Sequence, residues 1–558
     1  MCDSIGGMKR KSTPPVFKEY LQGQVVLLPT DLEAQIPARH LVRVVNAAIE
    51  QMDLRSLLAR YKGGGTSSYH PKMLLKVLVY AYTQQLYSSR KIAKALRENI
   101  FFMWLSGNQQ PDFRTINRFR SEVVKGVIEE IFTSVLELLI EEKYVKLENY
   151  FLDGTKIEAN ANKYSWVWGR STRHYKRILQ EKVKGLIRQI DQVNEAENAE
   201  YGERDLEEMG TDEPFDSHKL EQKIQELNQR LKAQSDKPQV EATQPVEPAP
   251  SEEKLPKPRK KRGRKGRSKL QKAQAALKKL EGDCLPRQKK YEEQERKLAG
   301  RNSYSKTDED ATFMRMKDDY MKNGQLKPGY NLQMGTEGQF IVGFSMHQRQ
   351  GDPGCLKPHL EKVKAQLGRL PKNVIADSAY GSEENYAYLN QEQVGNYLKY
   401  NFFGKEQRPR YKPDAFAADQ LKYDPEKNEF ICPAGKRLIY QYTFHRQTDN
   451  GYRGERRYYQ AEDCTDCPLK AQCHKAKGNR RVQISFQLQA WRRQASQNLT
   501  SEIGKKLRSQ RGVEVESVFG RLKENWGFRR FLLRGLEKVK TEIGLLCIAH
   551  NMAKLAVQ

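Results

Sequence analysis

Two short apolar runs that each end in an aspartate constrain this chain more than any other feature. In the first, NYFLDGTKIEANANK at residues 149–163, the run YFL leads into Asp153 and then Gly154. Such a run is typical of a buried strand, and glycine lets the backbone turn sharply, so we predict a strand that ends at Asp153. A carboxylate placed there needs a compensating cation, although an ordinary turn or cap residue gives the same local pattern.

The arrangement recurs in NVIADSAYGS, residues 373–382, where the run VIA leads into Asp377. Two strands that each deliver an aspartate at their C-terminal end can place both carboxylates side by side. Because neighbouring carboxylates repel each other unless a cation lies between them, the pair predicts a divalent-metal site. A third acid is available in RGVEVESVFGRLKENWGF, residues 511–528, whose apolar residues recur at helical spacing. Three oxygen ligands of this kind suit Mg²⁺ or Mn²⁺, the ions of phosphoryl-transfer chemistry.

The charge of the chain predicts a polyanionic partner. Lys and Arg number 98 against 70 acidic residues, a net charge of +28. Because the basic residues cluster in runs, we favour nucleic acid over the alternative of a merely basic soluble protein. No apolar segment follows the N-terminal charges as in a signal peptide, and the longest apolar run, LLKVLVYAY, is too short for a bilayer. We therefore expect a cytoplasmic protein with no membrane partner and no small-molecule substrate.

The third acid is predicted to be Glu516 and not Glu514. Two residues apart on a helix at about 100° per residue, they point roughly 200° apart, so only one can face the aspartates. Lys523 lies seven residues, or two turns, after Glu516 and shares its face, with Gly520 between them, where DNA backbone can approach closely. We predict that Lys523 holds a phosphate beside the metal ions. The alternative is a surface pair between Glu516 and Lys523.

The motifs LDGTKIEANANK and ADSAYGS and the Glu-x6-Lys helix resemble the three blocks of a DDE transposase, and more narrowly the "eleven eighty-two" group of bacterial insertion sequences. The resemblance extends from about residue 16 to the C-terminus. It implies a ribonuclease-H-like core in which Asp153, Asp377 and Glu516 bind two ions of Mg²⁺ or Mn²⁺. The family's helix often carries an Arg four positions before the Glu. Here that position is Gly512, and Arg511 is the nearest substitute for the DNA contact.

The first 125 residues are predicted to form a helical DNA-binding domain. Ser88 and Ser89 are good N-caps for a helix that begins near Arg90, and a short basic helix capped near Asp112 follows in PDFRTINRFR, residues 111–120. This pattern is typical of a helix-turn-helix whose second helix enters a major groove, or of a helical bundle with a basic surface. The resemblance implies that the domain binds terminal inverted repeats. The candidate DNA contacts are Arg114, Arg118 and Arg120.

A long charged section, residues 164–305, follows the first aspartate strand. Its apolar residues recur at coiled-coil-like spacing, which predicts helices that fold back on one another or form a homodimer contact. Within it, residues 233–268 are predicted to be disordered, and KPRKKRGRKGR forms a basic arm. We favour a non-specific phosphate clamp for Arg262 and Arg264 over insertion into an A·T-rich minor groove.

Residues 404–495 contain a cysteine cluster, formed by Cys432, Cys464, Cys467 and Cys473. Four thiolates in a cytoplasmic chain predict a structural zinc knuckle, with His474 as an alternate ligand; the alternative is a set of reduced thiols. The resembling family has the same Cys-Pro-x-Gly and Cys-x-x-Cys-Pro pattern.

Together these predictions describe an α/β chain with a ribonuclease-H-like mixed-sheet core, an α-helical N-terminal domain, a coiled-coil-like helical insertion and a zinc-knuckle insertion. The resemblance implies a nucleoid-associated bacterial DNA transposase that cuts at its element's terminal inverted repeats and joins them to target DNA. The alternatives are a metal-dependent nuclease without strand transfer and a non-catalytic DNA-binding regulator. The predicted segments are 1–125 (DNA-binding), 126–163 (connecting helix and first catalytic strand), 164–305 (helical insertion), 306–403 (core continued), 404–495 (zinc insertion) and 496–558 (C-terminal catalytic helices).

Overall fold

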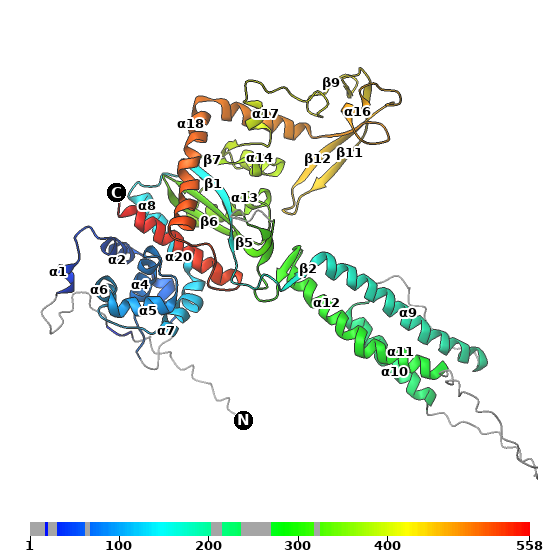
Figure 1. The fold of residues 1–558 in the computed structure, drawn as a ribbon, viewed down its shortest axis with the longest axis horizontal. Helices are drawn as coiled ribbons and strands as arrows, with labels where there is room; N and C mark the ends of the chain where they lie inside the picture. Colours follow the sequence, from blue (N-terminus) through cyan, green and yellow to red (C-terminus); the bar gives the residue numbers. More distant parts are fainter. Residues whose placement is uncertain (1–16, 20–30, 62–66, 202–214, 236–268, 317–323) are drawn as a thin grey trace, which may run out of the picture. The chain divides into compact units, whose positions relative to one another are not determined.

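The computed structural model describes residues 17–19, 31–61, 67–201, 215–235, 269–316 and 324–558. The chain divides into two compact units, one formed by Met1–Lys163 with Thr307–Gln558 and the other by Tyr164–Lys306 (Figure 1). The second unit is therefore inserted into the sequence of the first. The basic arm with Arg262 and Arg264 lies outside the described residues.

Helices form the N-terminal part of the first unit. Helix α4 (Pro71–Thr83) has a proline at its start, where no backbone donor is needed, and is buried on almost every side. Helix α7 (Phe113–Arg118) begins where the sequence predicts, because the Asp112 carboxylate accepts the N–H of Thr115 at 2.7 Å. The other elements here are α1 (Leu32–Gln35), α2 (Leu41–Gln51), α3 (Arg55–Leu58), α5 (Ser89–Glu98), α6 (Ile100–Ser106), the turns η1 (Phe119–Val123) and η2 (Val124–Gly126), and α8 (Ile128–Glu141).

A mixed sheet lies beside these helices in the same unit. Its order is β4-β5-β1-β7-β8, and β6 also pairs with β5, along residues that follow those paired with β4. Strands β1, β7 and β8 run parallel, whereas β5 is antiparallel to β1, β4 and β6. Gly338 and Gln339 both have positive φ, which suits the tight turn between β5 and β6. The bounds are β1 (Asn149–Glu158), β4 (Thr312–Arg315), β5 (Leu326–Glu337), β6 (Phe340–His347), β7 (Asn373–Ala376) and β8 (Gly395–Leu398).

The prediction that the first strand ends at Asp153 is wrong. Strand β1 continues to Glu158, because residues beyond Asp153 remain paired with β5. What ends near Asp153 is the parallel pairing with β7, whose last partners are Leu152 and Ala376. Gly154 therefore lies inside a strand, and its missing side chain serves a close approach rather than a turn.

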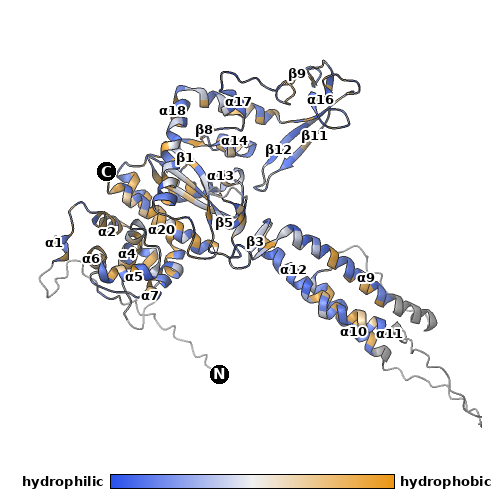
Figure 2. Cartoon of the chain, viewed as in Figure 1, coloured by the Kyte–Doolittle hydropathy of each residue, from blue (hydrophilic) through white to orange (hydrophobic). Residues whose placement is uncertain are grey.

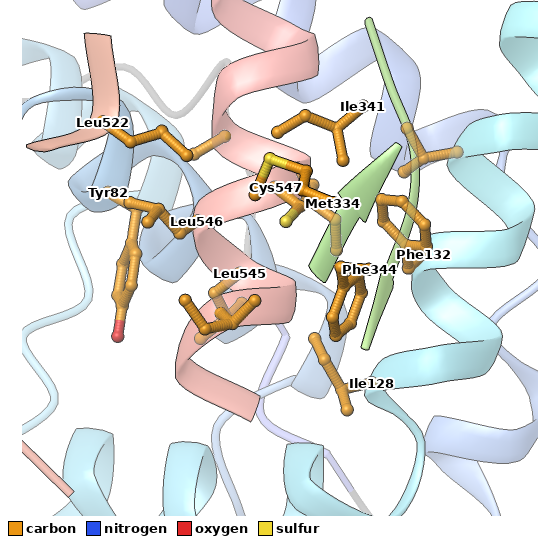
Figure 3. Packing of buried hydrophobic residues seen from close by; sticks show 14 of the residues in the cluster. Tyr82, Ile128, Phe132, Met334, Ile341, Phe344, Leu522, Leu545, Leu546 and Cys547 are labelled. Atoms are coloured by element: carbon orange, nitrogen blue, oxygen red, sulfur yellow. The ribbon is translucent and has the colours of Figure 1, made fainter. Parts of the chain in front are cut away.

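The C-terminal helix α20 (Leu536–Leu555) joins the N-terminal helices to the sheet in one apolar core. In Figure 3, Leu545, Leu546 and Cys547 of this helix lie among Tyr82 from α4, Phe132 from α8 and Phe344 from β6. Gly544 allows the helices to approach, since a Cβ there would lie 2.9 Å from Ile128 Cδ1. The predicted DNA-binding helices and the sheet thus share one continuous core.

Helices cross over between the parallel strands, and a second sheet follows them. Between β6 and β7 lie η4 (Pro353–Cys355) and α13 (Leu356–Leu367), and between β7 and β8 lie η5 (Ser378–Tyr380) and α14 (Glu383–Gln391). The second sheet has the order β13-β12-β11-β10-β9. Its region comprises α15 (Phe403–Glu406), β9 (Lys422–Asp424), β10 (Glu429–Ile431), β11 (Arg437–Gln447), β12 (Arg453–Ala461), α16 (Lys470–Cys473) and β13 (Arg481–Ile484).

A helical run with two π turns links the second sheet to α20. Its parts are α17 (Phe486–Thr500), α18 (Glu502–Arg511), the π turn η6 (Gly512–Glu516), α19 (Ser517–Gly520) and the π turn η7 (Arg521–Asn525). Such turns insert one extra residue into a helix and are frequent at functional sites.

The inserted unit is helical and begins and ends in a two-stranded sheet of β2 (Trp166–Trp168) and β3 (Ser303–Ser305). Its helices show apolar and polar stripes in Figure 2, and their apolar residues form a core of their own. Helix α9 packs against α11 and α12, so the helices fold back on one another. The helices are α9 (Gly169–Tyr201), α10 (Ser217–Ser235), α11 (Lys269–Lys279), the π turn η3 (Leu280–Cys284) and α12 (Leu285–Leu298).

These observations confirm the mixed α/β class, the mixed sheet and the helical N-terminal region. Among the described helices, none has both the length and the apolar character that crossing a lipid bilayer requires.

Candidate active site

Asp153 and Asp377 lie at neighbouring positions of adjacent parallel strands. Because Leu152 pairs with Ala376, the residue that follows each of this pair along the chain is one of the two aspartates. Strands are spaced about 4.8 Å apart, so the two carboxylates are brought to one place. Asp377 also begins the turn η5, where its Oδ1 accepts the N–H of Ala379 at 2.9 Å.

One guanidinium, that of Arg511, joins both aspartates to Glu516. Its Nη2 lies 3.0 Å from Asp153 Oδ2 and 4.0 Å from Asp377 Oδ2, and its Nη1 lies 2.8 Å from Glu516 Oε1. The side chains of Arg511 and Asp153 are each 10% exposed, against 37% for Asp377 and 56% for Glu516. The cluster is therefore buried at Asp153 and open to solvent at Glu516.

The π turn η6 explains how Arg511 reaches Glu516. In an α-helix, residues five apart point about 140° away from each other. The wider i→i+5 turn over Gly512–Glu516 brings them onto one face. The Val513 carbonyl in this turn accepts the Ser517 hydroxyl and the Gln339 side-chain amide, the latter at 2.9 Å. Side chains of Ser517 and Gln339 thus supply hydrogen-bond donors to a backbone carbonyl of the π turn.

Glu514 faces away from the aspartates. Its Oε2 accepts the backbone N–H of Gln339 at 2.6 Å, in the turn between β5 and β6. Burial raises the pKa of this carboxyl above its usual value. Glu514 therefore secures the helix to the sheet, while Glu516 lies beside the aspartates.

Lys399 is a cation near the cluster that sequence reasoning missed. Burial lowers its pKa, the charges of Arg511 and Arg508 lower it further, and the carboxylates of Asp377 and Glu516 oppose this. It directly follows β8, the parallel neighbour of β7. The signal in the sequence is a lysine at the end of the NYL strand, at the same edge as Asp377.

Polar groups of the chain also lie close to the aspartates without belonging to the predicted set. Burial raises the pKa of the Tyr380 phenol well above its usual value, and the carboxylates of Asp352, Asp153 and Asp377 add to the shift. Asp352 is therefore a further acid near Tyr380. The sequence places it between β6 and α13, where no strand pattern marks it.

The three carboxylates share a guanidinium, which is the positive charge that a divalent ion would otherwise supply. In the described ranges, no three His, Cys, Asp or Glu side chains are arranged to hold a metal ion. The donors nevertheless have the right chemistry, because Mg²⁺ and Mn²⁺ prefer carboxylate oxygens. The residues present therefore fit a divalent cation on condition that Arg511 moves away from them.

The four predicted zinc ligands, Cys432, Cys464, Cys467 and Cys473, line one pocket together with His474. Burial raises the pKa of the Cys473 thiol, and the other three thiols raise it further. Both ring nitrogens of His474 are buried and have no hydrogen-bond partner among the described residues. The donor types suit zinc, although the side chains are not drawn together as a ligand set.

The basic helix α7 presents two of its three predicted DNA contacts to solvent. Arg114 and Arg118 are exposed. Arg120 is only 3% exposed and donates to the Tyr87 carbonyl at 2.6 Å and the Tyr82 hydroxyl at 3.2 Å. Its guanidinium is held inside the helical core, so we leave Arg120 out of the DNA surface.

Lys523 lies in the second π turn, η7, and is 7% exposed. It therefore lies inside the fold rather than on an open face of the helix, where an α-helical register from Glu516 would place it.

Two family models match the chain. Residues 431–556 match the family described as "Transposase DDE domain", which includes Glu516 and the cysteine cluster, and residues 30–122 match "Transposase domain (DUF772)". No curated protein and no solved structure matches the chain. A DDE transposase domain implies a phosphoryl-transfer enzyme that uses a divalent metal. The chain is thus similar to transposases in two separate segments, one near its N-terminus and one that reaches almost to its C-terminus.

Proposed function

We propose that this protein is a DNA transposase of an insertion sequence, which cuts DNA at the ends of its element and joins them to target DNA. The observation that carries the proposal is the convergence of Asp153, Asp377 and Glu516 on one buried cation, Arg511. Both transposase matches support the same role. The motifs quoted above favour the "eleven eighty-two" group.

A ribonuclease-H-like core is part of the proposal. Its support is the strand order, in which antiparallel β6 and β5 precede parallel β1, β7 and β8 across the sheet. The two aspartates lie on β1 and directly after β7, the central parallel pair. Further support is that ligands usually bind in such sheets at the carboxyl ends of the parallel strands, which is where both aspartates lie.

In the proposed reaction, Asp153, Asp377 and Glu516 hold two Mg²⁺ or Mn²⁺ ions. When bound, such ions activate a water or a DNA 3′-hydroxyl and stabilise the leaving oxygen of an in-line displacement. Arg511, released from the carboxylates, becomes a donor for a phosphate oxygen, a role that guanidinium geometry suits. Lys399 supplies a second positive charge at the same edge, and Glu514 keeps the helix seated on the sheet.

We further propose that α7 binds the terminal inverted repeats through Arg114 and Arg118, which lie exposed on a helix with a firm N-cap. Because Lys523 is buried, we leave it out of the phosphate contacts. The basic arm stays a proposed phosphate contact, and we expect a homodimer in the bacterial cytoplasm. For the cysteine cluster we propose one structural zinc ion. The support is that four thiols line one pocket together with His474, whose ring nitrogens find no hydrogen-bond partner in the described part of the chain.

The matched variants Glu516→Gln and Glu514→Gln test the assignment of the third acid. We expect Glu516→Gln to abolish Mg²⁺-dependent cleavage of DNA carrying the element's ends, while DNA binding and melting temperature stay unchanged. Glu514→Gln, two residues away, should retain most activity. The reverse outcome refutes the assignment. A strand-transfer assay with labelled ends then separates a transposase, which joins the ends to target DNA, from a nuclease that only cuts.

A further inference from the structure

A chain of buried polar groups lies on the opposite face of the sheet from Arg511. The Tyr380 hydroxyl donates to Gln333 Oε1, and Gln333 Nε2 donates to Asp352 Oδ1 at 3.0 Å. Asn331 Nδ2 donates to the same Asp352 oxygen at 2.7 Å, and its own Oδ1 accepts from Gln333 Nε2 at 3.0 Å. Asn331, Gln333 and Tyr380 are fully buried. Every polar atom of the Gln333 amide group thus has a partner within this network.

The network touches both elements that carry an aspartate. Gln333 is the register partner of Gly154 on β1, the residue after Asp153. Tyr380 closes the turn η5 that Asp377 begins. Because successive strand residues point to opposite faces, Asp153 faces Arg511 while Gly154 faces Gln333. The Gln333 side chain therefore lies on the face of the sheet that is opposite to Asp153. It is also hydrogen-bonded to Tyr380, in the turn that Asp377 begins.

Gly154 provides the space that Gln333 occupies. A Cβ at this position would overlap Gln333 Nε2 and would lie 2.7 Å from Asp352 Oδ1. Any side chain at position 154 would therefore push the network away from β1. The glycine of the LDGT motif, which the sequence suggests is a turn residue, is instead explained by this close approach.

A buried polar network contributes less to the free energy of folding than apolar residues of similar size often do. Its benefit is fixed geometry, because each hydrogen bond sets one distance between groups. Here the bonds join β5, the strand that pairs with the strand of Asp153, to the turn of Asp377. Groups that orient metal ligands in this way change metal affinity by about 10- to 100-fold when they are mutated.

We propose that Gln333 is a positioning residue that sets the spacing of the Asp153 and Asp377 carboxylates for metal binding. The Tyr380 hydroxyl holds the amide oxygen of Gln333, and the Asp352 carboxylate holds its amide nitrogen. The inference rests on the proposed function, because it presumes that these aspartates hold Mg²⁺ or Mn²⁺. Gln333 touches neither the ions nor DNA; it acts only through the strand and the turn.

The test is Mn²⁺ binding to full-length protein without DNA, measured by calorimetry. Gln333→Met keeps the volume of the side chain and removes all its hydrogen bonds, and Tyr380→Phe removes only one hydroxyl. We expect Gln333→Met to weaken Mn²⁺ binding about tenfold or more and Tyr380→Phe to weaken it less, with binding to end DNA unchanged in both. The double variant should bind Mn²⁺ no more weakly than Gln333→Met alone, since both changes break one pathway.

Gln348→Met is the matched control. Gln348 is a half-buried glutamine that directly follows β6, and its amide donates to the Asp310 carbonyl at 2.8 Å and not to this network. Unchanged Mn²⁺ affinity in Gln333→Met and Tyr380→Phe would overturn the positioning role, even if both melt at lower temperature. If Gln333→Met does not fold, Tyr380→Phe alone decides the result. Wild-type protein whose Mn²⁺ binding is the same as that of Glu516→Gln would instead overturn the proposed function, and the positioning role with it.

Discussion

Replacing Arg511 with alanine should make the protein less stable without metal and tighten its binding of Mn²⁺. The guanidinium and the Asp153 carboxylate are 3.0 Å apart and each is nine-tenths buried, so removal of the arginine leaves a buried charge without its partner. Breaking such a pair costs about 3–5 kcal/mol. The pairs with Asp377 and Glu516 add little, because both carboxylates are more than one-third exposed and solvent screens them.

The same pair opposes metal binding in the wild-type protein, because the guanidinium must leave before an ion can take its place. If about 3 kcal/mol of pairing is lost in that step, Arg511→Ala binds Mn²⁺ on the order of a hundredfold more tightly, since about 1.4 kcal/mol corresponds to tenfold. The increase in Mn²⁺ affinity is smaller, toward tenfold, if the released guanidinium of the wild-type protein forms hydrogen bonds to water or to another acceptor. DNA cleavage should nevertheless fall, because the proposed phosphate donor is missing.

Urea unfolding in EDTA and in saturating Mn²⁺, together with calorimetric Mn²⁺ titration, measures both effects. In EDTA we expect Arg511→Ala to lose about 3 kcal/mol of unfolding free energy, and in Mn²⁺ most of that loss should disappear. Lys506→Ala, at an exposed position of the same helix α18, is the control and should change neither quantity. If Arg511→Ala binds Mn²⁺ with unchanged or weaker affinity, the guanidinium does not compete with the ion and the reasoning is refuted.

Three further predictions concern other parts of the chain. Arg118→Ala should weaken binding of the terminal repeats more than binding of random DNA, measured at several salt concentrations; equal losses would exclude base recognition by this residue. Purified protein should contain about one zinc ion per chain, and Cys467→Ser should unfold the surrounding sheet; metal-free protein with an equally stable mutant would contradict the site. Burial lowers the pKa of His550 to about 4, so protonation below its usual pKa of about 6.5 favours the unfolded chain. Stability should therefore fall by up to about 3 kcal/mol from pH 6.5 to 4, and His550→Gln should lose this part of the slope.

Local patterns in the sequence were enough to predict the elements around the site. The run before Asp377 is the strand β7. The basic helix begins at its predicted cap, Asp112. In each case the deciding interactions lie within a few residues, so apolar spacing and capping chemistry are sufficient.

Two errors arise where distant segments decide the structure. The sequence suggests that the backbone turns at Gly154 and that the strand ends there. Pairing with β5 instead extends the strand beyond this residue, and the close approach of Gln333 explains why it is glycine. Arg120 reads as one of three surface cations on a basic helix. It is buried instead, because the Tyr87 carbonyl and the Tyr82 hydroxyl accept its donors and the Glu542 carboxylate of α20 adds to the favourable electrostatics. A composition-based reading cannot distinguish a buried cation from a solvated one.

The spacing of Arg511 and Glu516 shows a more general limit of motif reading. The resembling family often carries an arginine four residues before the glutamate, and this chain has Gly512 there. The π turn adds one residue to the helix, and with it the arginine five residues before reaches the same carboxylate at 2.8 Å. The shift of the arginine by one position is therefore compensated by the extra residue of the π turn. Neither feature explains the contact with Glu516 without the other. Since a Cβ at Gly512 would meet only Glu516 Oε2, at 3.8 Å, the glycine is not needed for space. What places the guanidinium among the acids is thus the width of the turn, a property of the backbone that residue identities four positions apart do not reveal.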